Sequence, residues 1–160
     1  MSPPIRILFV CLGNICRSPM AQGILTGKLK EKKINAVVDS AGTASYHIGD
    51  HPDPRTIVAA GRHGVDISSY RAKQFSYDFF GKFDIIYAMD MANYRDLAGR
   101  AKTGEEKAKV KLLLDELHPG SGKGVPDPWY GGDAEFEKVF KLLDDVCNKV
   151  AEKLMEPKFN

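Results

Sequence analysis

Cys11 and Arg17 lie in a short segment, residues 10–18, that reads Val-Cys-Leu-Gly-Asn-Ile-Cys-Arg-Ser. A cysteine thiolate is a nucleophile, and an arginine guanidinium can bind two oxygens of a phosphate at once. Gly13 and Asn14 suit a tight turn whose backbone approaches a ligand closely. The segment therefore indicates a loop that holds a tetrahedral oxyanion and directs a thiolate at its centre.

The sequence on either side predicts a strand and a helix that position this loop. Residues 5–10 are apolar and rich in β-branched side chains, which is typical of a buried strand. Ser18 is the expected N-cap of a helix that contains Pro19 in its first turn and ends near residue 33. Loop N–H groups and the positive end of this helix would converge on an anion and favour the thiolate form of Cys11.

Three other interpretations fit parts of this loop. Cys11 could be a buried core residue with an unrelated arginine nearby. Cys11 and Cys16 could bind zinc together with His47 and His51, but a guanidinium beside a metal cation is unfavourable, so we expect no metal. A Walker-type nucleotide loop is excluded, because the sequence has no G-x-x-x-x-G-K-[ST] pattern.

The segment resembles the phosphate-binding loop of the low-molecular-weight protein tyrosine phosphatases. The resemblance covers almost the whole chain and continues, in the family's order, through Asp39-Ser40-Ala41-Gly42, Pro52-Asp53-Pro54-Arg55, Met89-Asp90 and Asp127-Pro128-Trp129-Tyr130. It implies an enzyme that hydrolyses phosphotyrosine and aryl phosphate monoesters through a phosphocysteine intermediate, without a cofactor. Its partners would be phosphotyrosine proteins or peptides, with phosphate and other oxyanions as inhibitors.

Cleavage of a phosphate ester needs an acid that protonates the departing oxygen. Asp127, which stands between Pro126 and Pro128, matches the family's general acid. In the second step the same carboxylate would take a proton from the attacking water. An aspartate in a proline-rich turn is also common as a purely structural feature, so the residues alone leave that alternative open.

The remaining predicted site residues support the loop or surround its opening. Ser18 can hydrogen-bond the thiolate, and the resemblance implies that Asn14 is tied to Ser40. Asp90 could orient a neighbour or only cap the next helix, and Tyr70 stands where the family often has histidine, which puts a supporting role there in doubt. The predicted phosphate-binding and supporting residues are Leu12, Gly13, Asn14, Ile15, Cys16, Ser18 and Ser40, and the predicted aromatic rim is Tyr46, Trp129 and Tyr130.

The order of elements predicts a single α/β domain spanning residues 1–160. Apolar residues at helical spacing, from Phe136 to Leu154, predict a long amphipathic helix over residues 134–157. Strands alternating with helices indicate a four-stranded parallel sheet covered on both faces, with ligands at the carboxyl ends of its strands. The strand order 2-1-3-4 is implied by the resemblance. The other expected elements are strands at 36–39, 84–89 and 110–114 (the last could be helical), helices at 54–63, 76–81 and 92–97, a helix start or turn at 103–106, and loops at 40–43, 45–53 and 118–132.

Composition narrows the function classes further. A net charge of +2 in 160 residues is too small to indicate binding to nucleic acid or to a membrane surface. Three cysteines, an odd number, argue against a disulfide framework and favour a reducing compartment. The first residues lack the apolar region of a signal peptide, and no apolar run approaches the ~18 residues of a membrane span. We therefore expect a cytoplasmic protein.

Three rival functions share parts of this pattern. A thiol-dependent arsenate reductase needs further cysteines near the middle of the chain, and none lies between Cys16 and Cys147. Phosphoarginine phosphatases that resemble this loop have threonine where Ile15 stands. A catalytically silent phosphopeptide-binding module would not need the intact set of Cys11, Arg17 and Asp127.

Overall fold

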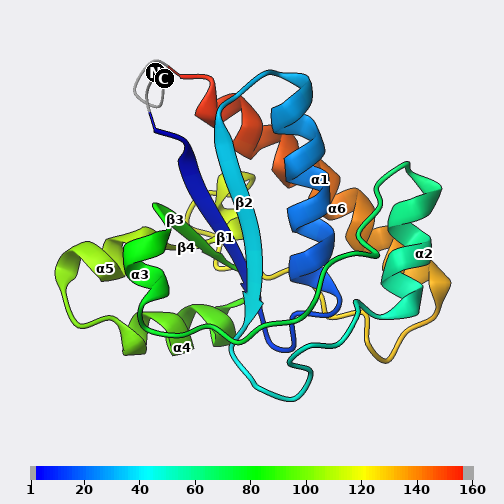
Figure 1. Cartoon of the computed structure of the whole chain (residues 1–160), viewed down its shortest axis with the longest axis horizontal. Coiled ribbons are helices and arrows are strands. Elements are labelled where there is room, and N and C mark those ends of the chain that lie inside the picture. Colours follow the sequence, from blue (N-terminus) through cyan, green and yellow to red (C-terminus); the bar gives the residue numbers. More distant parts are fainter. Residues whose placement is uncertain (1–2, 157–160) are drawn as a thin grey trace.

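The computed structural model describes residues 3–156, which form a single α/β domain around one parallel sheet (Figure 1). The sheet order is β2-β1-β3-β4, and every neighbouring pair is parallel. The predicted fold class and strand order are confirmed. The strands are β1 (Ile5–Cys11), β2 (Ala36–Gly42), β3 (Ile85–Ala88) and β4 (Val110–Leu112). The helices are α1 (Arg17–Glu31), α2 (Pro54–Arg62), α3 (Phe79–Lys82), α4 (Met91–Arg100), α5 (Gly104–Lys109), the 3-10 helix η1 (Leu113–Glu116) and α6 (Asp133–Leu154).

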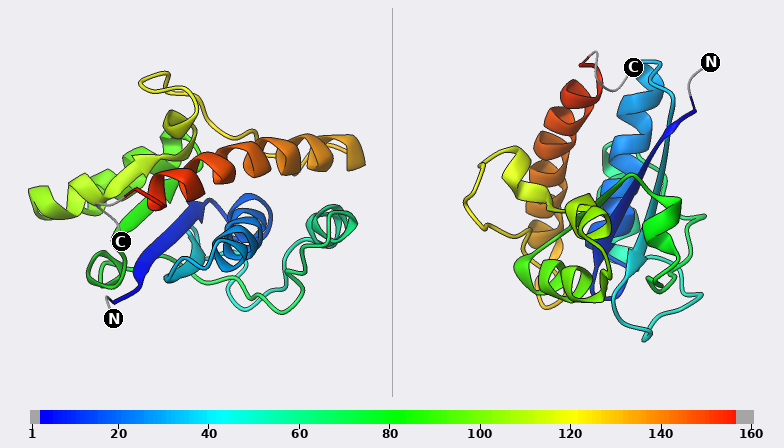
Figure 2. Two further views of the ribbon diagram at one scale, coloured as in Figure 1. Left: turned by 90° about the horizontal axis from the view of Figure 1, so that it is seen from above. Right: turned by 90° about the vertical axis from the view of Figure 1, so that its left-hand side faces the viewer.

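Helices cover both faces of the sheet, as Figures 1 and 2 show. Along the central strand β1, Ile7 and Phe9 point into a core formed with α1, α2 and α6. Leu8 and Val10 point to the other face and pack with side chains from α3 and α4. All four side chains are completely buried, which explains why this strand is a continuous apolar run rather than an alternating one.

Helix α6 buries one stripe of side chains against α1 and α2. The stripe contains every apolar residue predicted for it, from Phe136 to Leu154. The helix begins at Asp133 and ends at Leu154, somewhat before the predicted end, and Pro157 lies outside the described residues. No helix within residues 3–156 is long and apolar enough to cross a bilayer.

Several predicted boundaries were wrong. Helix α1 begins at Arg17 with Cys16 as its N-cap, so Ser18 does not cap it, and the helix ends at Glu31. Strand β2 continues to Gly42, where we predicted a loop from Ser40, because it pairs with β1 along its whole length.

The second half of the chain needs smaller corrections. The helix predicted at 76–81 is only the short α3, Phe79–Lys82, preceded by turns. The ambiguous segment at 110–114 is a strand for three residues and then becomes 3-10 helix. Thr103 starts α5 with a complete capping box with Glu106.

Candidate active site

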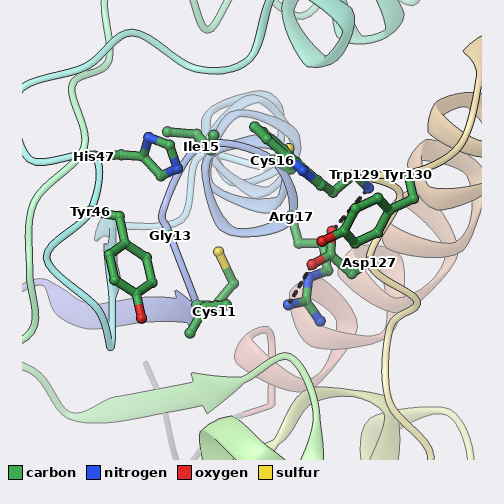
Figure 3. Close-up of a pocket in the computed structure, with 11 residues that line it drawn as sticks. Cys11, Gly13, Ile15, Cys16, Arg17, Tyr46, His47, Asp127, Trp129 and Tyr130 are labelled. Carbon is green, nitrogen blue, oxygen red and sulfur yellow. Dashed lines mark hydrogen bonds and ion pairs between the residues drawn. The ribbon is translucent and has the colours of Figure 1, made fainter.

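The carboxyl end of β1, the start of α1 and two long loops surround one cavity of about 350 Å³ (Figure 3). Most of the predicted site residues meet there. The cavity is lined by Cys11, Leu12, Gly13, Ile15, Cys16, Arg17, Tyr46, His47, Asp127, Trp129 and Tyr130. Asn14, Ser18 and Ser40 are buried and are not among the residues that line this cavity.

Residues 11–18, which we call the Cys11 loop, hold the sulfur of Cys11 between two polar groups. The backbone N–H of Asn14 points at Sγ from 3.3 Å, and the hydroxyl of Ser18 lies 3.0 Å from it. Ser18 Oγ already accepts a hydrogen bond from Asn14 Nδ2, at 2.8 Å, so its own proton can point at the sulfur, which is nearer than its other acceptor, the Ala41 carbonyl oxygen at 3.5 Å. Both contacts stabilise a negative sulfur more than a neutral one.

Asn14 fixes the shape of this loop. Its backbone is left-handed, with φ of +59°, a conformation that costs a non-glycine residue roughly 1–2 kcal/mol. Side-chain hydrogen bonds hold it there: Nδ2 also donates to Ser40 Oγ at 2.9 Å, and Oδ1 accepts from the backbone N–H of Lys73 at 3.0 Å. Ser40 in turn donates to Gln22 on α1. These hydrogen bonds therefore attach the Cys11 loop to β2 and α1.

Gly42 allows β2 to end directly beneath the Cys11 loop. A Cβ at this position would lie 2.7 Å from the carbonyl oxygen of Leu12 and 3.0 Å from the carbonyl carbon of Gly13. Both neighbours are backbone atoms, which cannot rotate away. Any side chain at residue 42 would therefore displace the Cys11 loop.

The guanidinium of Arg17 is buried, with only 4% of the side chain exposed. Nη1 donates to Asp90 Oδ2 at 2.8 Å and to the carbonyl oxygen of Val125 at 2.9 Å. Burial opposes the positive charge, but the neighbouring Cys11 and Asp90 outweigh it and raise the pKa of Arg17 above its ordinary value. Arg17 is thus a fixed cation beside the sulfur.

Asp90 has both of the roles that the sequence left open. One carboxylate oxygen orients Arg17, and the other accepts the backbone N–H of Asn93 at 2.8 Å and so caps α4. An aspartate at the end of β3 therefore connects the guanidinium to a helix N-terminus.

Asp127 lies beside Arg17, on the side of the cavity away from Tyr46 and His47 (Figure 3). Its side chain is 45% exposed, and Oδ2 lies 3.8 Å from Arg17 Nη2. The other oxygen accepts the backbone N–H of Trp129 at 3.1 Å. Tyr46, Trp129 and Tyr130, the three residues predicted as an aromatic rim, also line the cavity and are all exposed.

His47 also lines the cavity, whereas its sequence context suggested only a metal ligand. Its Nδ1 lies 3.1 Å from Asp50 Oδ2, and its ring centre lies 6.0 Å from that of Trp129. Its position next to Tyr46 was the available signal. Within residues 3–156, no three His, Cys, Asp or Glu side chains form a group that could hold a metal.

The two remaining cysteines and Tyr70 differ in their relation to the cavity. Cys16 lines it, and burial raises the pKa of its thiol to about 12. Cys147 is fully buried on α6, and burial raises its pKa even further. Burial also raises the pKa of Tyr70, which contacts Thr26 and is not among the residues that line the cavity.

A parallel α/β sheet with a Cys-x5-Arg-Ser loop between its central strand and first helix defines a class of phosphate-handling enzymes. The family profile named "Low molecular weight phosphotyrosine protein phosphatase" matches residues 6–159, and the chain belongs to this family. It is a low-molecular-weight protein tyrosine phosphatase, a hydrolase.

Individual relatives are similar to this chain along nearly their whole lengths. A Synechocystis protein that carries the family name is 43% identical over 148 residues, covering 91% of this chain and 94% of the relative. The human low molecular weight phosphotyrosine protein phosphatase is 39% identical over 150 residues, covering 92% and 94%. A crystal structure of a protein tyrosine phosphatase from Entamoeba histolytica, with Hepes in the active site, is 36% identical with a TM-score of 0.89, covering 96% and 99%.

Proposed function

We propose that this enzyme hydrolyses phosphotyrosine in proteins or peptides through a phosphocysteine intermediate on Cys11. The observation that carries the proposal is the convergence of the Cys11 sulfur, the buried Arg17 guanidinium and the exposed Asp127 carboxyl on one cavity. Leu12, Gly13, Asn14, Ile15 and Cys16 supply the backbone of the phosphate-binding loop. Ser18 and Ser40 support the loop from inside.

In the first step the Cys11 thiolate attacks phosphorus, an S–P bond forms and the P–O bond to the tyrosine oxygen breaks. Arg17 binds two of the phosphoryl oxygens, and the loop N–H groups bind the oxygens as charge builds on them. Asp127, in its protonated form, donates a proton to the departing phenoxide. Tyrosine leaves as a neutral phenol.

In the second step a water molecule attacks phosphorus, and the Asp127 carboxylate takes one of its protons. The S–P bond breaks, Cys11 leaves as a thiolate and inorganic phosphate is released. The Ser18 hydroxyl at 3.0 Å stabilises the sulfur as it regains negative charge. The enzyme returns to its starting state without a metal or cofactor.

The rim defines the substrate class. Tyr46, Trp129 and Tyr130 around the opening favour a flat ring through area burial and stacking. Inorganic phosphate and other tetrahedral oxyanions should compete for the same loop. The Entamoeba relative binds Hepes, a sulfonate, in its active site, which supports this expectation.

Location and redox behaviour follow from the thiols. Cys11, Cys16 and Cys147 are all free, which suits a cytoplasmic enzyme. Cys16 lines the same cavity as Cys11, so after a peroxide oxidises Cys11 to a sulfenic acid the Cys16 thiol can displace water from it and form a disulfide, which a dithiol reduces to restore both thiols.

Turnover of three matched peptides tests the proposal. Peptides carrying phosphotyrosine, phosphoserine or phosphoarginine are compared, each with and without a chelator. We expect fast release of phosphate from the tyrosine peptide alone, unaffected by chelator. Faster turnover of phosphoarginine, or no turnover of any peptide, would contradict the proposed substrate class.

A further inference from the structure

The loop that carries Asp127 makes mainly local contacts. We call residues 126–131 the acid loop. Trp129 N–H bonds back to Asp127, and the Gly131 N–H donates to the carbonyl of Pro128 at 2.8 Å. The Tyr130 side chain is 97% exposed. Such contacts shape the loop internally but do not fix its distance from the Cys11 sulfur.

Arg55, in the first turn of α2, contacts this loop. Its Nη1 donates to the carbonyl oxygen of Gly131 at 3.2 Å. The guanidinium also lies over two aromatic rings, 4.6 Å from the centre of Phe136 and 5.5 Å from that of Trp129. One side chain therefore contacts the acid loop, one of its rim aromatics and the first turn of α6.

Asp53 holds the Arg55 guanidinium in place through two side-chain hydrogen bonds. Nε donates to Asp53 Oδ1 at 3.1 Å and Nη2 donates to Oδ2 at 2.8 Å, a two-pronged pair. Asp53 is buried and also caps α2 by accepting the backbone N–H of Arg55. Hydrogen bonds to Arg55 hold the pKa of Asp53 below its ordinary value, so this carboxylate stays charged.

Asp53 is in turn attached to the Cys11 loop. Its backbone N–H donates to the carbonyl oxygen of Ile15 at 2.8 Å. A continuous path therefore runs from the loop that holds the nucleophile, through Asp53 and Arg55, to the loop that holds the acid. The path lies outside the cavity, because neither Asp53 nor Arg55 lines it.

We propose that Arg55 is a positioning residue that sets the distance between Asp127 and the leaving-group oxygen. The inference rests on the proposed function, since it assumes that Asp127 is the general acid. Arg55 itself does not contact the substrate. Without it, the far end of the acid loop loses its bond to α2 and Trp129 loses a neighbour. Asp127 then spends less time within proton-transfer distance.

Arginine is required because three contacts are made at once. Its planar fork satisfies both Asp53 oxygens and the Gly131 carbonyl while one face packs on Phe136. Lysine has the charge but no fork, so it can pair with Asp53 or reach Gly131 but cannot do both. Arg55→Lys therefore separates loss of charge from loss of geometry.

Arg62 offers a matched control on the same helix. Its guanidinium lies 3.7 Å from Asp133 and 3.6 Å from Glu137, so it also joins α2 to the first turns of α6. It has no hydrogen bond to the acid loop among the described residues. Loss of Arg62 therefore weakens the α2–α6 contact without releasing Gly131.

The test measures kcat/KM for aryl phosphates whose phenols span a wide range of acidity. It uses the wild-type enzyme, Arg55→Met, Arg55→Lys and Arg62→Met. With a poor leaving group, both Arg55 variants should lose about 10- to 100-fold. With an electron-poor nitrophenyl phosphate, which needs little protonation, they should lose no more than about threefold. Arg62→Met should keep the wild-type dependence on leaving group, and inhibition by phosphate should be unchanged in all variants.

Several outcomes would overturn the proposal. They are an equal loss with every leaving group, a wild-type dependence in Arg55→Lys, or the same steepening in Arg62→Met. Thermal melting of each variant identifies general destabilisation, and Arg55→Lys keeps the question answerable if Arg55→Met does not fold. A wild-type enzyme that hydrolyses no aryl phosphate would contradict the proposed function instead, so the two failures are distinguishable.

Discussion

The two loops that meet at the cavity differ sharply in how the rest of the protein holds them. In the Cys11 loop, Arg17 and Ser18 are buried, and Asn14 is hydrogen-bonded both to Ser18 on α1 and to Ser40 on β2. In the acid loop, Tyr130 is almost fully exposed and the hydrogen bonds are mostly local. The Cys11 loop is therefore part of the core, whereas the acid loop lies at the protein surface.

This difference matches what the proposed mechanism requires of each loop. Stabilising a phosphoryl group requires donors that are already in place, because any reorganisation during the reaction reduces their benefit. An acid at the rim must let a substrate enter and then reach its leaving oxygen, which requires some freedom. Arg55 and Asp53 limit that freedom from outside the cavity.

Cys11→Ser should give the largest effect. A serine hydroxyl is not ionised at neutral pH, so turnover should fall by about 10⁴-fold or more. Because the loop keeps its other groups, the variant should still bind phosphate, as measured by calorimetry. Substantial residual hydrolysis would rule out the covalent mechanism.

Arg17→Lys should be the next most severe change. Lysine cannot bind two phosphoryl oxygens in one plane, nor replace the bonds to Asp90 and Val125, so kcat/KM should fall by about 10³-fold. Steady-state kinetics on a phosphotyrosine peptide measures this. Near-normal rates would mean that the buried loop does not bind phosphate through this side chain.

Trp129→Ala tests the exposed loop. Losing an aromatic wall should lower kcat/KM for a phosphotyrosine peptide by about tenfold, because ring stacking and area burial are lost. The inhibition constant for inorganic phosphate should hardly change, since phosphate does not reach the rim. If both fall equally, Trp129 supports the loop and does not contact the substrate.

The thiols of the Cys11 loop should react differently with pH. A pKa of about 12 keeps Cys16 protonated at neutral pH, so iodoacetamide at pH 7 should label Cys11 first, and labelling of Cys16 should rise as the pH approaches 12. Mass spectrometry of the peptides distinguishes the two sites. Equal labelling at pH 7 would contradict the burial of Cys16.

Peroxide treatment should also distinguish the roles of Cys11 and Cys16, with the smallest effect of the series. If Cys16 traps an oxidised Cys11, a dithiol should restore a smaller fraction of activity to oxidised Cys16→Ser than to the oxidised wild type. Activity before oxidation and after recovery is compared within each protein. Equal recovered fractions would leave Cys16 with a packing role.

Features that depend on neighbours in the sequence could be predicted well. The buried run of β1, the stripe of α6 and the glycine-containing turn after Cys11 are local patterns, and their elements are where the sequence placed them. Ser18 is the instructive failure. It has the ordinary properties of an N-cap, but its hydroxyl accepts a hydrogen bond from Asn14 and contacts the Cys11 sulfur instead, and the N-cap is Cys16, two residues earlier.

Features that depend on distant segments could not be predicted from the residues alone, and the strand order and the Asn14–Ser40 contact were expected only from the family resemblance. Nothing near Arg55 in the sequence indicates that it contacts Gly131, which lies 76 residues away. His47 reaches the cavity only because loop 45–53 folds over the Cys11 loop, where a Cβ on Gly13 would lie 3.0 Å from the histidine ring. Asp90 contacts Arg17 because β3 lies beside β1.

The dependence of kcat/KM on leaving-group acidity, measured for the wild type and Asp127→Ala, tests the division between the two loops most directly. If the exposed loop delivers the proton and the buried loop does the rest, the wild-type rate depends weakly on the phenol and the variant rate steeply. Phosphotyrosine turnover should fall by about 10²–10⁴-fold in the variant, and turnover of an electron-poor nitrophenyl phosphate much less. An equal loss across the whole series would contradict the account, because Asp127 would then hold its loop without donating a proton.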